Sequence, residues 1–232
     1  MLYQHIFFDL DHTLWDFERN AAEALKEIYE SFEIDLLSNC WGWEDFLKIF
    51  LKTNETLWHR YNHNQIDAAT LRDTRFKIVF AQLGVEDTAI PYNLLSETYS
   101  RLTPQKTHLI PHTLEVLDYL QERYQLHIIS NGFTEVQAIK LEFSGLRAYF
   151  DLVITPEAVG FKKPHRQIFD FTIENIKAER SACLMIGDSL DTDIQGAKNA
   201  ELDHVFFNPQ KIVHQEKIHK EIHSLRELMD WL

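Results

Sequence analysis

The 232-residue chain contains only two cysteines, Cys40 and Cys183, which lie far apart in the sequence. They form no C-x-x-C pair, so the sequence gives no indication of a disulfide framework. Isolated cysteines are typical of a protein from a reducing compartment. We interpret Cys183 as a small buried hydrophobic residue.

Long apolar stretches are also missing, which excludes a transmembrane helix. The first apolar run, Ile6-Phe7-Phe8, ends at Asp9 and is too short for a signal peptide. The sequence shows no repeats and no low-complexity segment. We therefore expect a cytoplasmic protein that has no membrane partner.

Positive charge is in short supply, because 23 Lys and Arg residues stand against 36 Asp and Glu residues. The formal net charge of -13 repels polyanions, so we expect no nucleic acid polymer as a partner. A small phosphorylated ligand is compatible with this charge where cations are placed locally. The hydrophobic content of 45% is typical of a globular protein.

Residues 1–15 and 106–232 together predict an α/β domain. His5 to Asp9 is typical of a short buried strand that ends at a carboxylate. After Pro111, helical and strand patterns alternate, which predicts a Rossmann-like parallel sheet with helices on both faces. The further strands are expected at Leu126–Ile129, Leu152–Ile154, Ala182–Ile186 and His204–Phe207.

Residues 16–105 have a different pattern, in which apolar residues recur at helical spacing and strand patterns are nearly absent. This pattern predicts a bundle of about four helices, inserted as a cap domain between the first strand and the rest of the sheet. One expected buried face consists of Ala21, Ala24, Leu25, Ile28 and Phe32.

The first strand leads into the motif Asp9-Leu10-Asp11-His12-Thr13. Asp9 can attack phosphorus and form an aspartyl phosphate, while Asp11 can protonate the leaving oxygen and later accept a proton from water. A D-x-D pair also arises by chance, and Asp191-x-Asp193 is a second example in this chain. The buried strand before Asp9 and the Thr13 after it favour the first pair.

Ser130-Asn131-Gly132 follows the second expected strand and precedes a helix. A hydroxyl, a small amide residue and a glycine can donate hydrogen bonds to phosphate oxygens, and the N-terminus of the helix attracts the same anion. The sequence therefore predicts a phosphate-binding turn at these three residues.

Lys163-Pro164 follows the third expected strand. An ammonium group here can neutralise a transferring phosphoryl group and keep Asp9 charged. Lys162 competes with Lys163 for this role.

Gly187 and Asp188 follow the fourth expected strand. Asp188 can ligate a hard cation such as Mg²⁺, and Asp193 can orient metal-bound water or Lys163 from behind the ligands. Asp191 is expected to cap the helix that follows. Gathered carboxylates repel one another unless a cation is present, so the acidic residues Asp9, Asp11 and Asp188 together predict a magnesium site.

These four motifs, in this order, resemble the signature motifs of the haloacid dehalogenase-like superfamily. The resemblance covers the whole chain and implies a Rossmann-like core with a helical type 1 cap. It implies that Asp9 is the nucleophile, that Asp11 is the general acid/base, and that Mg²⁺ is bound by Asp9, Asp188 and the backbone carbonyl of Asp11. The positions that match the family's phosphate-binding residues are Thr13, Ser130, Asn131 and Lys163.

The dehalogenases of this superfamily lack an aspartate at the position of Asp11 and need no magnesium, so the sequence resembles a phosphatase. The stretch from Asp9 to Phe17, with Asn20 and Ala24, resembles the pyrimidine 5'-nucleotidase branch. That resemblance implies a small phosphorylated substrate, a pyrimidine nucleoside monophosphate. We expect a monomer or a small homo-oligomer.

Three alternatives are weighed against this function. A phosphatase for another small metabolite, such as a sugar phosphate, and a phosphomutase share all four motifs. A non-catalytic binding protein on the same fold is the third. The intact set of catalytic residues argues against it, since a degenerate member is expected to lose one or more of Asp9, Asp11, Lys163 and Asp188.

Aromatic residues in and near the cap are candidates for contacting a substrate, because nucleobases stack readily on aromatic rings. The candidates are Phe17, Trp41 and Trp43, and we interpret Trp58 as a packing residue. Two histidine pairs have zinc-binding spacing on predicted helices, but no third ligand is evident for either, so we do not expect zinc. These pairs are His59 with His63 and His219 with His223.

Overall fold

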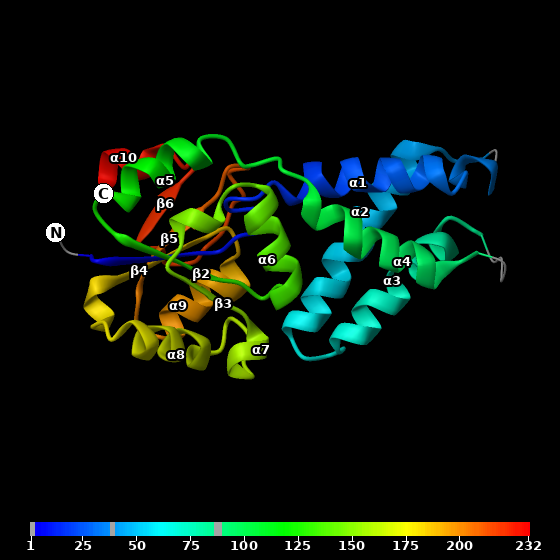
Figure 1. Cartoon of the computed structure of the whole chain (residues 1–232). Helices are drawn as coiled ribbons and strands as arrows, with labels where there is room; N and C mark the ends of the chain where they lie inside the picture. Colours follow the sequence, from blue (N-terminus) through cyan, green and yellow to red (C-terminus); the bar gives the residue numbers. More distant parts are fainter. Residues whose placement is uncertain (1–2, 38–39, 86–89) are drawn as a thin grey trace. The chain divides into compact units, whose positions relative to one another are not determined.

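The computed structural model describes residues 3–37, 40–85 and 90–232. The chain divides into two compact units, which are drawn in Figure 1. One unit runs from the N-terminus to Phe17 and from Thr107 to Leu232, and the other is Glu18–Lys106. The first unit is therefore discontinuous in sequence, with the second inserted after its first strand.

The first unit is built on a parallel sheet whose strands lie in the order β3-β2-β1-β4-β5-β6. β1 lies between β2 and β4, so the order reverses beside β1, and parallel α/β sheets bind ligands at the carboxyl ends of the strands at such a reversal. The strands are β1 (His5–Phe8), β2 (Gln125–Ile129), β3 (Leu152–Ile154), β4 (Cys183–Gly187), β5 (Asp203–Phe207) and β6 (Lys220–Ile222).

Helices cover both faces of this sheet, as the sequence predicted. Successive side chains of a strand point to opposite faces, so Phe8 of β1 is buried with α5, α6 and α10, whereas Phe7 is buried with α8 and α9. Figure 1 shows α5 and α10 on the opposite side of the sheet from α8 and α9. The helices of this unit are α5 (Thr113–Gln121), α6 (Thr134–Phe143), α7 (Pro156–Val159), α8 (Arg166–Ile176), α9 (Gln195–Asn199) and α10 (Glu227–Trp231).

The turn after β4 differs from the sequence prediction. A turn of π-helix, Leu190–Ile194, precedes α9, and its N-cap is Ser189, whose side chain accepts a hydrogen bond from the Thr192 amide at 3.3 Å. The prediction that Asp191 caps this helix was wrong. Serine and aspartate cap helices equally well, so the residue type alone did not decide between them.

The second unit is a helical bundle, as the sequence predicted. Its apolar faces meet in one core, where Ile28 of α1, Phe46 of α2 and Phe80 of α3 are almost completely buried. Asp67 caps α3 by accepting a hydrogen bond from the Thr70 amide at 2.7 Å. The main helices are α1 (Phe17–Ser31), α2 (Trp43–Asn62), α3 (Ala68–Gln82) and α4 (Tyr92–Leu102).

The chain leaves and re-enters the first unit through two paired segments. The Asp16 amide donates to the His108 carbonyl at 3.1 Å, and the Ile110 amide donates to the Leu14 carbonyl at 2.9 Å. Both connections are thereby fixed to the sheet-containing unit by backbone hydrogen bonds. The turn that carries the first motif is held at the same place.

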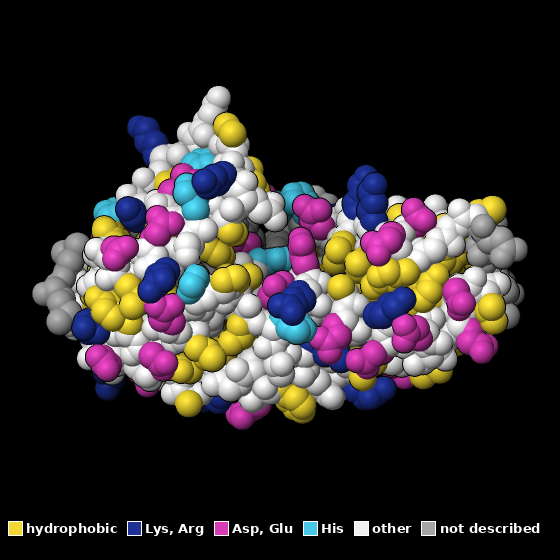
Figure 2. All heavy atoms as spheres, turned by 90° about the horizontal axis from the view of Figure 1, so that it is seen from above, with side chains coloured by type: hydrophobic (Ala, Val, Ile, Leu, Met, Phe, Trp, Pro, Cys, Tyr) yellow, Lys and Arg dark blue, Asp and Glu magenta, His cyan; other side chains and the backbone are white. Residues whose placement is uncertain are grey.

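Acidic and basic side chains are interspersed on the surface of both units in the view of Figure 2. Among the described residues, no helix combines the length and apolar character that a membrane crossing requires.

Candidate active site

Two strand ends meet at the reversal point of the sheet. Asp9 directly follows β1, and its amide donates to the Ile186 carbonyl of β4 at 2.9 Å. Asp188 follows β4, and its Oδ1 accepts a hydrogen bond of 2.8 Å from the Thr13 hydroxyl. Carboxylate oxygens of Asp9, Asp188 and Asp193 all lie within 4.8 Å of one another. Segments far apart in the sequence thus form one acidic cluster.

The side chain of Lys163 reaches into this cluster and is only 1% exposed. Its Nζ lies 2.6 Å from Oδ1 of Asp9 and 2.7 Å from Oδ1 of Asp193. It also donates to the carbonyl of Ile129 at 2.6 Å. These three contacts account for the three donors of an ammonium group, so the position of Lys163 is fully determined. The lysine at this place is Lys163 rather than its neighbour Lys162.

The cluster holds more negative than positive charge. Burial and the nearby carboxylates raise the pKa of Asp188 to about 7, and burial also raises the pKa of Asp9 despite the opposing effect of Lys163. Lys163 favours the charged form of Asp9, but burial has the larger effect on its pKa. A divalent cation would supply the missing positive charge.

The donor set fits a hard cation, because Mg²⁺ prefers carboxylate and carbonyl oxygens. Oδ1 of Asp193 lies 2.7 Å from the Lys163 ammonium, and its Oδ2 accepts a hydrogen bond of 3.1 Å from the Ser189 amide. Asp9 and Asp188 are therefore better placed to ligate an ion, and Asp193 forms an ion pair with Lys163.

The amide of Asn131 supports Lys163 from the backbone side. Its Nδ2 donates to the Lys163 carbonyl at 2.9 Å, and its Oδ1 accepts from the Lys163 amide at 2.8 Å. The side chain of Asn131 thus holds the second and third motifs together, and that it binds phosphate stays a prediction. Thr13 is fully buried and donates to Asp188, and that it binds phosphate also stays a prediction.

Ser130 lies at the start of the turn that leads into α6. Its Oγ accepts hydrogen bonds from the Gly132 amide at 3.1 Å and from Nε2 of Gln137 at 2.6 Å. Because both bonds use the oxygen as acceptor, the Ser130 O–H can donate to an anion. A Cβ atom on Gly132 would overlap the Gln137 side chain, so close packing requires glycine here.

The carboxylate of Asp11 contacts two side chains of α6. Its Oδ1 lies 2.5 Å from Nζ of Lys140, and its Oδ2 accepts from Nε2 of Gln137 at 2.9 Å. Burial alone would raise the pKa of Asp11, but Lys140 and the two hydrogen bonds outweigh burial and lower it. The sequence analysis missed Lys140 and Gln137. Their signal is a polar pair, three residues apart, on the buried side of a helix.

The aromatic residues singled out from the sequence pack within their own units. The ring of Phe17 lies 5.0 Å from His12 and 6.3 Å from Trp15, measured between centroids. Trp41 and Trp43 pack against the core of the helical bundle. That these three residues face a substrate stays a prediction.

The two histidine pairs have other contacts. Nδ1 of His63 bonds to the carbonyl of His59 at 2.8 Å. His219 and His223 flank strand β6, so the prediction that they share a helix was wrong. Nδ1 of His223 bonds to the Asn208 carbonyl at 2.7 Å.

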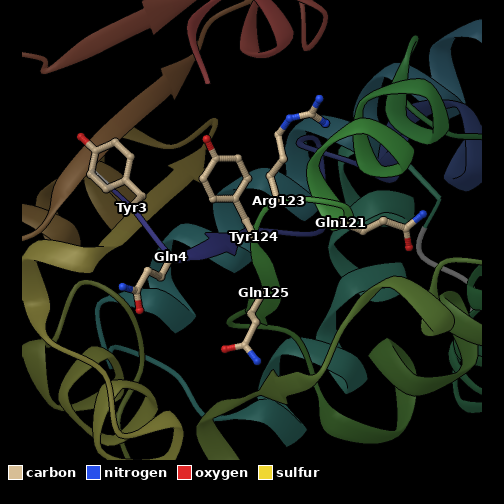
Figure 3. A pocket seen from close by; sticks show the side chains of 6 residues that line it. All are labelled: Tyr3, Gln4, Gln121, Arg123, Tyr124 and Gln125. Carbon is tan, nitrogen blue, oxygen red and sulfur yellow. The ribbon is translucent and has the colours of Figure 1, made fainter. Parts of the chain in front are cut away.

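A separate open pocket of about 560 Å³ lies at the amino ends of β1 and β2, shown in Figure 3. The catalytic candidates follow the carboxyl ends of these strands, so the pocket is not part of the acidic site. Two tyrosine hydroxyls at its wall already have protein partners, since Tyr3 donates to Asp203 at 2.8 Å and Tyr124 to the Leu232 carbonyl at 2.7 Å. Its lining residues are Tyr3, Gln4, Gln121, Arg123, Tyr124 and Gln125.

The strand order and the four strand-end motifs agree with a comparison against known families. The sequence model of the haloacid dehalogenase-like hydrolases matches residues 3–201, and the chain belongs to this family. It is therefore an enzyme of the hydrolase class.

Among curated proteins, two pyrimidine 5'-nucleotidases are similar over the full length. PynA of Streptococcus pneumoniae is 30% identical, with 100% of this chain and 96% of that protein covered. YjjG of Escherichia coli is 30% identical, with 99% of each covered. Among solved structures, the magnesium-bound HAD-hydrolase YfnB of Bacillus subtilis superimposes with a TM-score of 0.88 at 29% identity, covering 100% of this chain and 99% of that one.

Proposed function

We propose that this enzyme is a magnesium-dependent phosphomonoester hydrolase that acts through an aspartyl phosphate on Asp9. The observation that carries the proposal is the buried Lys163 ammonium, 2.6 Å from Asp9 and 2.7 Å from Asp193, beside Asp188. The carboxylates outnumber the one ammonium group, and such an excess of buried negative charge suits a site that binds a divalent cation.

In the first step, an oxygen of Asp9 forms a bond to phosphorus while the bond from phosphorus to the leaving oxygen breaks. Asp11, whose pKa is lowered by Lys140, must first take up a proton, and its carboxyl group then gives that proton to the leaving oxygen. The Lys163 ammonium and the Ser130 hydroxyl stabilise the negative charge on the transferring group.

In the second step, water attacks the phosphorus of the aspartyl phosphate. The carboxylate of Asp11 takes the proton of the water, inorganic phosphate leaves, and the carboxylate of Asp9 is restored. One aspartate thus serves first as acid and then as base.

The acidic site is suited to hold Mg²⁺ through Asp9, Asp188 and the backbone carbonyl of Asp11. The ion would supply positive charge that lets an anionic phosphate approach an anionic nucleophile. The raised pKa values of Asp9 and Asp188 support this assignment, and so does the magnesium bound by YfnB.

The proposed substrate is a pyrimidine nucleoside monophosphate. Similarity to two pyrimidine 5'-nucleotidases over nearly the full length of the chain supports this class. We propose that the enzyme acts in the cytoplasm as a monomer or a small homo-oligomer.

The test is a phosphate-release screen over nucleoside monophosphates and sugar phosphates, with and without Mg²⁺. We expect release that requires Mg²⁺ and is fastest with pyrimidine nucleotides. Preference for a sugar phosphate would replace the proposed substrate class but keep the mechanism. Turnover only in the presence of a sugar bisphosphate primer would instead indicate a phosphomutase.

The role of Asp9 is tested with Asp9→Asn, which should abolish turnover without unfolding the protein. Asp191→Asn is the matched control, because Asp191 belongs to the second D-x-D pair and is exposed. Full activity of Asp9→Asn, with the asparagine verified by mass spectrometry, would contradict the proposal.

A further inference from the structure

Two residues of α6 together hold both oxygens of one carboxylate. Lys140 lies 2.5 Å from Oδ1 of Asp11, and Nε2 of Gln137 lies 2.9 Å from Oδ2. Residues three apart project from the same face of a helix, so a single carboxylate can reach both. The side chain of Asp11 is thereby fixed in both position and rotation.

Lys140 is unusual because only 5% of the residue is exposed. Its ammonium lies 4.5 Å from the centroid of the Trp15 ring, while Trp15 itself forms a backbone bridge with Asp11. The ammonium therefore contacts the carboxylate and an indole ring that belong to the same turn. A buried ion pair of this kind contributes little to stability compared with apolar packing, which points to a role in positioning.

Gln137 connects Asp11 to the phosphate-binding turn. Its Nε2 donates both to Asp11 and to Oγ of Ser130, at 2.9 Å and 2.6 Å. Its own Oε1 is buried and makes no hydrogen bond with the described residues. Leaving this carbonyl unsatisfied costs free energy, so the orientation of the amide is set by its two acceptors. The amide thereby fixes the spacing between Asp11 and Ser130.

We propose that Lys140 and Gln137 are positioning residues that hold the Asp11 carboxyl group at a fixed distance from a phosphate bound at Ser130. This inference rests on the proposed function, in which Asp11 delivers a proton to the leaving oxygen. It deepens that function by assigning two side chains of α6 to proton delivery. Neither residue belongs to the four strand-end motifs.

Substrates with different leaving groups distinguish a positioning role of Lys140 and Gln137 from general structural support. An alkoxide, such as the ribose oxygen of a nucleotide, must be protonated as it leaves. A nitrophenolate leaves readily without a proton. A displaced Asp11 should therefore slow the first step, transfer of the phosphoryl group to Asp9, far more with a nucleotide than with p-nitrophenyl phosphate.

The experiment compares Lys140→Met with the unchanged enzyme on uridine 5'-monophosphate and on p-nitrophenyl phosphate, with Mg²⁺ present. If the screen selects another alkyl phosphate, that compound replaces the nucleotide. We compare kcat/KM, because it reports the first phosphoryl transfer and not the second step, in which Asp11 acts as base for both substrates. On the alkyl phosphate we expect kcat/KM to fall about 10²-fold, the loss that follows from a small misplacement of a catalytic group. On p-nitrophenyl phosphate we expect a change of about threefold or less.

Two further variants complete the test. Gln137→Leu should show the same selective loss, and it replaces Lys140→Met if that variant does not fold. Lys198→Met is the matched control, because it removes a lysine from a partly exposed ion pair with Glu216 and should leave both activities unchanged. In an Asp11→Asn background, Lys140→Met should add no further loss, since Lys140 acts through Asp11.

Equal losses on the two substrates, no loss at all, or a full additional loss in the Asp11→Asn background would each overturn the inference. These outcomes leave the proposed function intact, provided that Asp9→Asn is inactive. Activity of Asp9→Asn would instead contradict the proposed function itself. The two failures are therefore distinguishable.

Discussion

The hydroxyl of Thr13 donates a hydrogen bond of 2.8 Å to Oδ1 of Asp188, although 175 positions separate the two residues in sequence. Thr13 is completely buried, so this bond does not exchange with bulk water. It orients a candidate metal ligand from the turn that also carries the proposed nucleophile. This hydrogen bond therefore links the turn that carries the nucleophile to a candidate metal ligand.

Replacing Thr13 by valine keeps the shape of the side chain and removes this hydrogen bond. We expect the apparent affinity for Mg²⁺ to fall about 10- to 100-fold, the usual effect of losing a residue that orients a metal ligand. The measurement is the Mg²⁺ dependence of phosphate release. Thr13→Ser retains the hydroxyl and should stay close to the unchanged enzyme. An unaltered Mg²⁺ dependence in Thr13→Val would contradict this role.

Magnesium binding should depend on pH through Asp188. Its pKa is raised to about 7 by burial and nearby carboxylates, so below that pH an incoming ion must displace a proton. We expect affinity to weaken by up to about tenfold per pH unit below pH 7.

The raised pKa of Asp188 also predicts that the stability of the protein depends on pH. A carboxyl group whose folded pKa lies above its unfolded value destabilises the metal-free protein as pH rises toward 7. Mg²⁺ should therefore raise the melting temperature more at pH 8 than at pH 6. An equal gain in melting temperature at pH 6 and pH 8 would argue against a raised pKa of Asp188.

Gly132→Ala should lower activity while the protein stays folded. The added Cβ overlaps the Gln137 side chain, which must move away from Asp11 and Ser130. We expect kcat for a nucleotide to fall about 10²-fold, because small displacements of catalytic groups cost rates of this order. Gly42→Ala is the control, since a Cβ there meets no atom within 4 Å. Retained full activity of Gly132→Ala would show that Gln137 can move without consequence.

Acid should destabilise the protein partly through His127. Burial and the neighbouring His5 lower the pKa of His127 to about 4. Between pH 6.5 and pH 4 the unfolded chain therefore binds a proton more readily than the folded protein, and the free energy of unfolding decreases as pH falls. One group with this shift contributes about 3 kcal/mol by pH 4.

His127→Phe should remove that contribution. The measurement is denaturant unfolding between pH 7 and pH 4, where the variant should lose less stability than the unchanged protein. His127 stacks on His5 at 5.4 Å between ring centroids, so phenylalanine keeps an aromatic contact. An identical pH slope in the two proteins would assign the acid sensitivity to other groups.

Much of the sheet could be predicted because its strands are apolar and alternate with helical patterns. Strand β6 was missed because Lys220–Ile222 has three residues, of which only Ile222 is apolar. A segment that short and polar has no detectable periodicity, and it pairs because β5 presents an edge. Its position is decided by tertiary structure.

The sequence analysis named the site residues that follow the carboxyl ends of the strands. Asp9, Lys163, Asp188 and Asp193 converge because parallel strands bring their carboxyl ends to one edge. Lys140 escaped prediction because a lysine on a helix is ordinarily solvent-exposed. Only the packing of α6 against the first turn shows that its charge is buried beside Asp11.

The central place of β1 has a consequence for protein synthesis. β1 is made first, but both of its neighbours, β2 and β4, come much later, at Gln125 and Cys183. The inserted helices of Glu18–Lys106 have their own core and can fold before β2 and β4, the partners of β1, are synthesised. A ribosome-bound chain therefore has no complete acidic site until Asp193 has emerged, and a chain that ends between Lys106 and Asp193 contains the whole helical unit but no complete catalytic centre.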